Sequence, residues 1–167
     1  MLGGPYPGGA RIGQKALQGK PNELVHFSRI FLDHESYQFS FSGMKSQVHF
    51  LLAQLQEKKI PLDEQLIADI AYEFQEAVVE VLGKKLIQAA HSFNAKTIGI
   101  AGGVSANDRL FQYTAEHAMK RFSAKEIITE NENSITVSET FDGQSIPLLR
   151  PMKKLYSTDN AAMIGVV

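Results

Sequence analysis

The sequence contains no cysteine and no apolar run close to the length of a membrane span. The absence of cysteine excludes disulfide bonds and metal sites built from thiolates, and it agrees with a cytoplasmic protein. A membrane helix needs about 20 consecutive apolar residues, so we expect no contact with a membrane. The first residues show no basic segment followed by an apolar one, so no signal peptide is expected.

The chain also lacks a surplus of either charge. It has 17 Lys and Arg and 18 Asp and Glu, which give a formal net charge of −1. Such a balance produces no long-range field that would attract nucleic acid or a membrane surface, so any contact with RNA has to be local. At 167 residues and without an internal repeat, the chain is long enough for one domain with a sizeable core. We therefore expect a single domain over residues 1–167.

The most informative stretch is residues 97–107, Thr-Ile-Gly-Ile-Ala-Gly-Gly-Val-Ser-Ala-Asn. Its first residues have strand character, and Gly102 and Gly103 allow a tight turn or a close approach to a ligand. Asn107 is suited to cap a helix over Asp108–Arg121. Such a junction is a natural place for phosphate or ribose, because backbone N–H groups and the helix dipole favour negative charge there. The alternative is a tight connection that binds nothing, since a glycine pair lacks the full fingerprint of a nucleotide-binding turn.

Apolar residues at helical spacing predict the other helices. A short one is expected over residues 10–18, an amphipathic one over 44–56, and the longest, which carries much of the core, over 64–93. A short apolar helix is expected near the end of the chain, after residue 157. Helices thus account for most of the expected secondary structure.

Strands are expected on either side of these helices, and residues 37–42 alternate bulky and polar side chains. Two early strands are expected at 27–32 and 37–42, and three later ones at 126–129, 134–139 and 145–149. The pair Asp142-Gly143 lies between the last two and is typical of a hairpin turn. The sequence therefore predicts an α/β fold in which residues 123–150 add a β-hairpin to the sheet.

Few residues are suited to independent chemistry. The histidines lack the four-residue spacing of a metal-binding pair on a helix, so each is expected to be a surface or packing residue. They are His26, His34, His49, His91 and His117. No combination of nucleophile, base and acid, and no pair of carboxylates, points to hydrolysis.

Two charged residues stand out from this background. Lys45 is expected in the first turn of a helix, where a cation is unfavourable unless it faces an anion; the alternative is a solvated lysine. Asp159 is expected at the start of the last helix, where its carboxylate either caps the helix or binds a cation. One carboxylate does not hold a metal alone.

Four segments together resemble one protein family. They are Tyr6-Pro7-Gly8-Gly9, Phe39-Ser40-Phe41-Ser42-Gly43-Met44-Lys45, Ala101-Gly102-Gly103-Val104-Ser105-Ala106-Asn107 and Thr158-Asp159-Asn160-Ala161-Ala162-Met163-Ile164. In this order they look like the C-terminal lobe of the tRNA N6-threonylcarbamoyladenosine synthase family, the TsaD or Gcp-type proteins once labelled O-sialoglycoprotein endopeptidases. The resemblance extends from about residue 3 to residue 165, and the segment 123–150 is longer than the family usually has there.

The resemblance implies an actin-like ATPase (ASKHA) lobe with a mixed sheet flanked by helices. It also implies transfer of a threonylcarbamoyl group from threonylcarbamoyl-AMP to N6 of the adenosine next to the anticodon, in tRNAs that read ANN codons. The implied ligands are tRNA and threonylcarbamoyl-AMP or ATP, and the implied partners are related subunits of a transfer complex. The family carries one divalent metal, iron or zinc, between its lobes.

The same resemblance suggests roles for individual residues. Gly9 matches a glycine that lines the nucleotide site, with Gly102 and Gly103 as further nucleotide-binding residues. Asn107 matches the polar contact to the ribose or adenine, and Asp159 matches a metal-ligand aspartate. Lys45 is the one candidate, and a weak one, for a catalytic role.

The sequence departs from the family by lacking its N-terminal lobe. That lobe carries a His-x-x-x-His metal pair and a glycine loop, which no segment of this chain matches. We therefore expect a C-terminal lobe that is inactive unless the first lobe is supplied. The alternative is a non-catalytic interaction or nucleotide-binding lobe of the same superfamily. The segments 39–45 and 158–164 argue against a kinase or ATPase relative.

Overall fold

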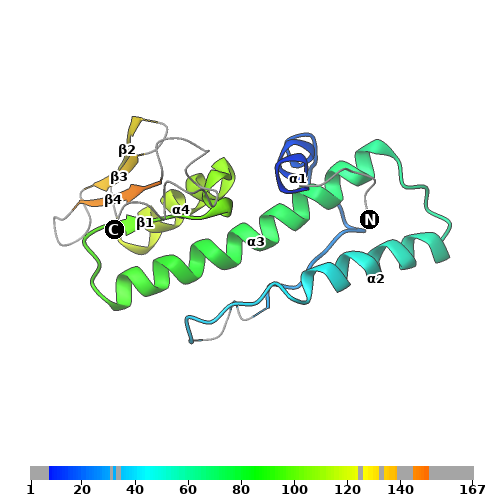
Figure 1. Ribbon diagram of the computed structural model, residues 1–167, viewed down its shortest axis with the longest axis horizontal. Coiled ribbons are helices and arrows are strands. Elements are labelled where there is room, and N and C mark those ends of the chain that lie inside the picture. The colour runs from blue at the N-terminus through cyan, green and yellow to red at the C-terminus, as the bar shows by residue number, and fades with distance from the viewer. Residues whose placement is uncertain are drawn as a thin grey trace, which may run out of the picture. The chain divides into compact units, whose positions relative to one another are not determined.

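A computed structural model describes residues 8–30, 32, 35–123, 126–131, 134–138 and 145–150. The chain forms two compact units, Met1–Val81 and Leu82–Val167, and the boundary falls inside the longest helix (Figure 1). No helix in the described part of the chain has the length and apolar character needed to cross a membrane. Each unit has its own hydrophobic core.

Helices dominate the first unit. Helix α1 is Gly9–Ala16, helix α2 is Met44–Glu57, and helix α3, which begins here, is Glu64–Ser92. The start of α3 is set locally, because Asp63 Oδ1 accepts a hydrogen bond of 2.8 Å from the backbone N–H of Leu66. All three helices lie where the sequence predicts them, with ends that differ by one or two residues.

The core of the first unit lies between α2, α3 and the chain that joins α1 to α2. Phe27 is fully buried and packs edge-on against Phe74 of α3, with ring centroids 6.2 Å apart. Around this pair the buried apolar residues are Val25, Met44, Val48, Leu51, Leu55, Leu66, Ile70 and Ala77. Helical spacing of apolar residues on α2 and α3 is thus explained by this core.

The strands predicted at 27–32 and 37–42 are wrong, since the described residues in both ranges form turns and extended coil. Side chains take the place of a strand partner in the first range. The N–H of Phe27 donates to Glu73 Oε1 at 3.2 Å, and the N–H of Ser28 donates to Gln47 Oε1 at 2.7 Å. From Val25 to Ser28 the residues are alternately buried and exposed, as they would be in a strand, but the segment lies over helices and joins no sheet.

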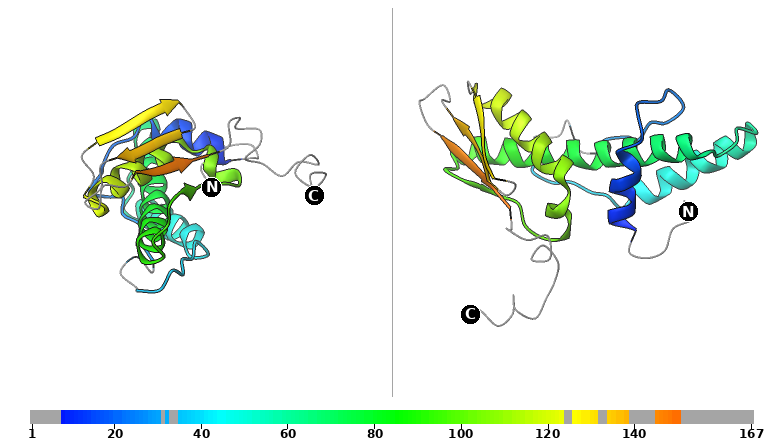
Figure 2. Two further views of the ribbon diagram at one scale, coloured as in Figure 1. Left: turned by 90° about the vertical axis from the view of Figure 1, so that its left-hand side faces the viewer. Right: turned by 90° about the horizontal axis from the view of Figure 1, so that it is seen from above.

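A four-stranded mixed sheet organises the second unit (Figure 2). Its strands are β1, Ile98–Gly99; β2, Glu126–Asn131; β3, Ser134–Ser138; and β4, Ile146–Leu149. The spatial order is β1-β4-β3-β2, with β1 parallel to β4 and the other pairs antiparallel. Ile98 pairs with Leu148, and Ile135 pairs with the same residue from the other side.

Helix α4, Asp108–Arg121, packs against this sheet, as the two views in Figure 2 show. Its buried residues Phe111, Ala115 and Ala118 join Ile87 and Ala90 of α3 in one core with the strands. From the sheet that core takes Ile98, Ile135, Ile146 and Leu148. The bounds of α4 are those predicted from the sequence.

The predicted α/β class, with helices and a small mixed sheet, is confirmed. Its finer assignment to the ASKHA type, and the interpretation of 123–150 as an added hairpin, stay predictions. The predicted turn at Asp142-Gly143 and the predicted helix after residue 157 lie outside the described residues.

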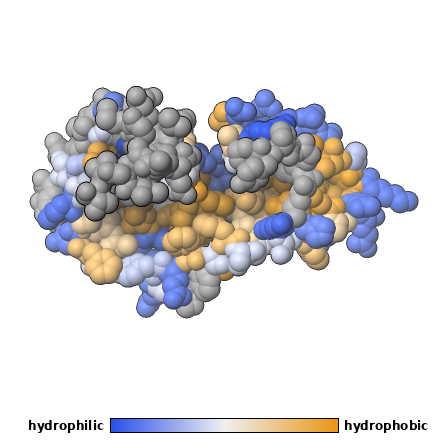
Figure 3. Space-filling view, in the orientation of Figure 1, coloured by the Kyte–Doolittle hydropathy of each residue, from blue (hydrophilic) through white to orange (hydrophobic). Residues whose placement is uncertain are grey.

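Large apolar side chains remain exposed on each unit. In the first unit Leu17 is 83% exposed and Phe50 66%, and in the second Phe93 is 72% exposed. Figure 3 shows hydrophobic surface beside hydrophilic surface on the face that it draws. Single apolar side chains exposed in this way are common on protein surfaces.

Candidate functional site

The glycine turn after β1 forms as the sequence predicts. The strand ends at Gly99, and Gly102 adopts φ 83° and ψ 174°, a conformation that side chains disfavour. A short 3-10 helix, Gly103–Ala106, follows and leads into α4. A methyl group placed on Gly99 or Gly102 would meet no atom within 4 Å. The turn therefore borders open space next to its backbone.

Asn107 caps helix α4, as predicted. Its Oδ1 accepts hydrogen bonds from the N–H groups of Arg109 at 2.9 Å and Leu110 at 3.3 Å. Its own N–H donates to the carbonyl of Val104 at 3.0 Å. The N–H groups of Arg109 and Leu110, at the start of α4, are therefore bonded to the cap and are not open to an anion, as a helix start without a cap would be. An anion at this turn has to use other groups.

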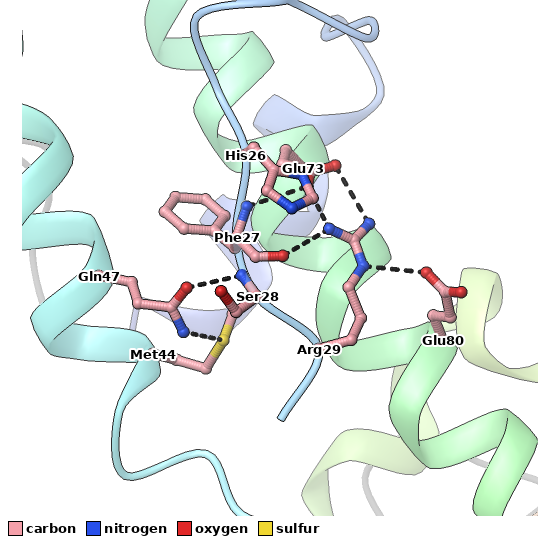
Figure 4. Close-up of polar contacts among 8 residues, drawn as sticks. All are labelled: His26, Phe27, Ser28, Arg29, Met44, Gln47, Glu73 and Glu80. Carbon is pink, nitrogen blue, oxygen red and sulfur yellow. Dashed lines mark hydrogen bonds and ion pairs between the residues drawn. The ribbon is translucent and has the colours of Figure 1, made fainter. Parts of the chain in front are cut away.

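A cluster of charged residues in the first unit has no counterpart in the sequence predictions (Figure 4). Arg29 donates through Nε to Glu80 Oε2 at 2.9 Å, through Nη1 to Glu73 Oε1, and through Nη2 to Glu73 Oε2 at 3.3 Å. Nη1 also donates to the carbonyl of Phe27 at 2.7 Å. His26 Nδ1 lies 3.5 Å from Glu73 Oε1. The guanidinium is thus bound to two carboxylates and to its own chain segment.

Burial lowers the pKa of Arg29, but hydrogen bonds and charge from Glu73 and Glu80 outweigh it and leave the pKa above its ordinary value. The cluster borders a cavity of about 700 Å³. Because the guanidinium already holds two carboxylates, it is poorly suited to bind an anionic ligand and well suited to fix residues 25–29 on α3. We interpret the cluster as an anchor.

Asp69 forms a second anchor on α3. Its side chain is buried and accepts hydrogen bonds from the N–H of Lys20 at 3.0 Å, Asn22 Nδ2 at 2.8 Å and Gln65 Nε2 at 2.8 Å. Burial raises the pKa of Asp69, but these hydrogen bonds and the charge of Lys20 together have a larger, lowering effect, so the pKa lies below its ordinary value. The carboxylate is therefore ionised and structural at neutral pH.

A signal for both anchors exists in the sequence. Asp69, Glu73, Glu76 and Glu80 follow one another at spacings of four, three and four, which places them along one stripe of a helix that also carries the apolar core positions. Acidic residues at such positions need partners, and those partners are far away in sequence. The spacing could have indicated the anchors but not Asn22 or Arg29.

Comparison with known proteins decides the family. The family model described as TsaD, tRNA N6-adenosine threonylcarbamoyltransferase, matches residues 1–166. The chain belongs to this family. Curated relatives named tRNA N6-adenosine threonylcarbamoyltransferase from Staphylococcus aureus strains JH9, N315 and Newman are 37% identical over 165 residues. Those matches cover 99% of this chain and 40% of each relative, so the chain spans about two fifths of their length.

The residues that resemblance to the TsaD family suggested fall in both units. Gly102, Gly103 and Asn107 lie together at the turn of the second unit. Gly9 begins α1 in the first unit, is exposed, and has no atom within 4 Å of a Cβ built on it. Lys45 is exposed in the first turn of α2, as predicted. Asp159 lies outside the described residues.

The TsaD family implies a divalent metal, which needs a group of coordinating side chains. Among the described side chains, no group of three or more His, Asp or Glu residues is arranged to hold a metal ion. A structural or catalytic metal needs three or four such ligands. The described residues therefore do not fit a complete metal site.

Proposed function

We propose that this chain is the C-terminal lobe of a tRNA N6-adenosine threonylcarbamoyltransferase. The observation that carries the proposal is the family match over residues 1–166, in a chain that spans 40% of its relatives. The reaction joins the adenosine N6 amine to the carbonyl carbon of the threonylcarbamoyl group of threonylcarbamoyl-AMP. The new N–C bond forms, the C–O bond to phosphate breaks, AMP leaves, and the amine loses a proton.

The glycine turn is the proposed nucleotide contact of the second unit. The positive φ of Gly102 and the open space beside it support a ligand that lies close to the backbone of Gly102 and Gly103. Asn107 would contact the ribose or adenine in addition to its capping role. In the first unit, Gly9 supports the same function through its exposed, open position at the start of α1.

Two charged groups complete the proposal. Lys45, exposed at the start of α2, is a candidate for binding the adenylate phosphate or developing negative charge. Asp159 would contribute one ligand to a divalent metal, iron or zinc, and the other ligands would come from the N-terminal lobe. Such a metal, when bound, would polarise the carbamoyl oxygen or organise the phosphate.

The proposed partners are that lobe, tRNA, and related subunits of a threonylcarbamoyl transfer complex in the cytoplasm. Contacts with such partners could cover the exposed Leu17, Phe50 and Phe93, and burial of apolar surface is favourable.

A non-catalytic nucleotide-binding or interaction lobe is the second candidate. The use of Asn107 Oδ1 as a helix cap favours an interaction lobe, since that oxygen, which belongs to the proposed nucleotide contact, is already bonded to the helix. The two candidates differ in whether the chain contributes to group transfer.

The test is a transfer assay with the full chain alone and mixed with a separately produced N-terminal lobe of the family. The mixture receives threonylcarbamoyl-AMP and an unmodified transcript of a tRNA that reads an ANN codon, and nucleoside analysis measures threonylcarbamoyladenosine. We expect product in the mixture and none with either part alone. The same mixture made with the variant Lys58→Gln serves as the control, because Lys58 is exposed at the end of α2.

Two results would contradict the proposal. If the mixture binds AMP but makes no product, while a full-length family member does under the same conditions, the non-catalytic candidate is favoured. If the chain alone makes product, the dependence on a first lobe is wrong.

A further inference from the structure

A row of stacked cationic and aromatic side chains runs along α4. Arg109, Tyr113, His117 and Arg121 follow one another at four-residue spacing, so neighbouring side chains adjoin and the row winds part of the way around the helix. Arg109 Cζ lies 5.4 Å from the centroid of the Tyr113 ring. The rings of Tyr113 and His117 are stacked, with centroids 4.5 Å apart and planes 18° apart. At about 1.5 Å per residue, the row is about 18 Å long.

Helix α3 holds this row in place within the second unit. A Cβ built on Gly83 would lie 2.6 Å from Tyr113 Cδ1, so the Tyr113 ring rests against the α3 backbone where only glycine leaves room. At the other end, Arg121 Nη2 lies 3.2 Å from His91 Nδ1 on α3. The side chains are therefore positioned before any ligand arrives, which reduces the entropy lost on binding.

The charge along this row is mostly positive towards the end of α4. Lys120 and Arg121 are exposed in the last turn, where they also complement the helix dipole. Glu116 is an acidic side chain beside the row; its Oε2 lies 3.5 Å from Arg109 Nη1 and its side chain is 54% exposed. Asp108 is paired with Arg150 at 2.7 Å.

We propose that the row Arg109–Tyr113–His117–Arg121 is a docking surface for the sugar-phosphate backbone of tRNA. Arginine forks suit phosphate oxygens, and the two arginines, about 18 Å apart along the helix axis with the Tyr113 and His117 rings between them, can each contact a phosphate of one strand. The net charge of the whole chain is −1, so binding of a polyanion requires such a local surface. The choice of tRNA among RNAs rests on the proposed function.

The experiment measures binding of the full chain to a fluorescently labelled, unmodified ANN-reading tRNA by anisotropy, over a series of KCl concentrations. For Arg109→Gln/Arg121→Gln we expect about 10-fold weaker binding and a salt slope smaller by about 2, because each removed arginine leaves about one phosphate without its cation. Lys58→Gln/Lys59→Gln removes two exposed charges at the end of α2 and should leave both quantities unchanged.

Two further variants test the row itself. Glu116→Gln should tighten binding about 2- to 5-fold, because it releases Arg109 from a competing carboxylate. Tyr113→Leu should weaken binding by about the same factor by removing the ring that orders Arg109, whereas Tyr113→Phe keeps the ring and should restore affinity. A merely structural role of Tyr113 would not produce the gain at Glu116.

Several outcomes would overturn the proposal. The docking surface is wrong if the double arginine variant keeps the affinity and salt slope of the unchanged chain, or if the chain does not bind tRNA at all. It is also wrong if polyglutamate of equal charge competes as well as unlabelled tRNA. Each result is independent of the transfer assay, so the docking surface and the proposed function can fail separately.

Discussion

At the scale of single residues, the buried carboxylate of Asp69 is the feature with the clearest consequence for stability. It receives three hydrogen bonds from Lys20 N–H, Asn22 and Gln65, and its pKa is lowered in the folded chain. A carboxyl group whose pKa is lower in the folded than in the unfolded state stabilises the fold above the unfolded pKa, about 3.9 for Asp. That contribution is lost as the pH falls through the folded value.

We expect the free energy of unfolding to fall as the pH is lowered below about 4, and Asp69→Asn to remove part of this dependence. At pH 7 the variant should be less stable by about 1–3 kcal/mol, because an amide nitrogen would face donors. Urea denaturation at pH 7, 4 and 3 measures both effects. Asp63→Asn keeps a helix cap and is the neutral-pH reference for losing one carboxylate from this part of the chain. Equal pH dependence in the unchanged chain and Asp69→Asn would contradict the assignment.

The sequence did not predict the partners of Asp69 or Glu73. Helical spacing predicted that α3 carries a buried face, and the structure confirms that part. Asn22 is 47 residues from Asp69, and Arg29 is 44 residues from Glu73. Periodicity describes neighbours along one element and contains no information about which distant segment crosses it.

At the scale of elements, local signals explain why the helices were predicted well. Asp63 and Asn107 both cap helices, and each makes its cap bonds with residues two or three positions away. The strand predicted over residues 27–32 is wrong, because bulky apolar residues there are typical both of strands and of extended segments that lie over helices. What distinguishes the two is the backbone partner, here Glu73 and Gln47, and this is a tertiary property.

The cap of α4 gives a prediction that separates structure from ligand binding at Asn107. Asn107→Ala should destabilise the chain by about 1 kcal/mol, whereas Asn107→Ser keeps a cap and should cost only a few tenths. If Asn107 also contacts the nucleotide, both variants should bind AMP more weakly than the unchanged chain. Thermal unfolding and calorimetric titration with AMP measure the two effects. Unchanged AMP affinity in Asn107→Ser would mean that Asn107 is a cap and nothing more.

At the scale of the whole molecule, the sequence and the structure contribute different parts of the conclusion. Four short segments were enough to predict the family, which the match over residues 1–166 confirms. The mixed sheet was predicted in outline, but its strand order was not, because pairing of β1 with β4 joins segments about 50 residues apart. The candidate site was predicted as a set of positions, and within the described residues the structure brings Gly102, Gly103 and Asn107 together at one turn.

Helix α3 belongs to the cores of both units, and this leads to a prediction for the chain as a whole. It contributes Ile70 and Ala77 to the core of the first unit and Ile87 and Ala90 to that of the second. Leu82→Pro should cost about 3 kcal/mol, because it removes a backbone hydrogen bond and clashes with the preceding turn. We expect amides of α2 and α4 to lose protection from hydrogen exchange together, since each helix packs on a core that α3 completes.

Glu64→Pro is the matched control, because it places proline at the first position of the same helix, where the residue is tolerated. It should leave the slowly exchanging amides of α4 unchanged and affect the first unit only through the lost ion pair with Lys15. Mass spectrometry of peptides from α2 and α4 reads the two units separately. If Leu82→Pro exposes α4 and leaves α2 fully protected, the first unit keeps its stability without an intact α3, and the helix connects two cores that open independently instead of being a shared part of both.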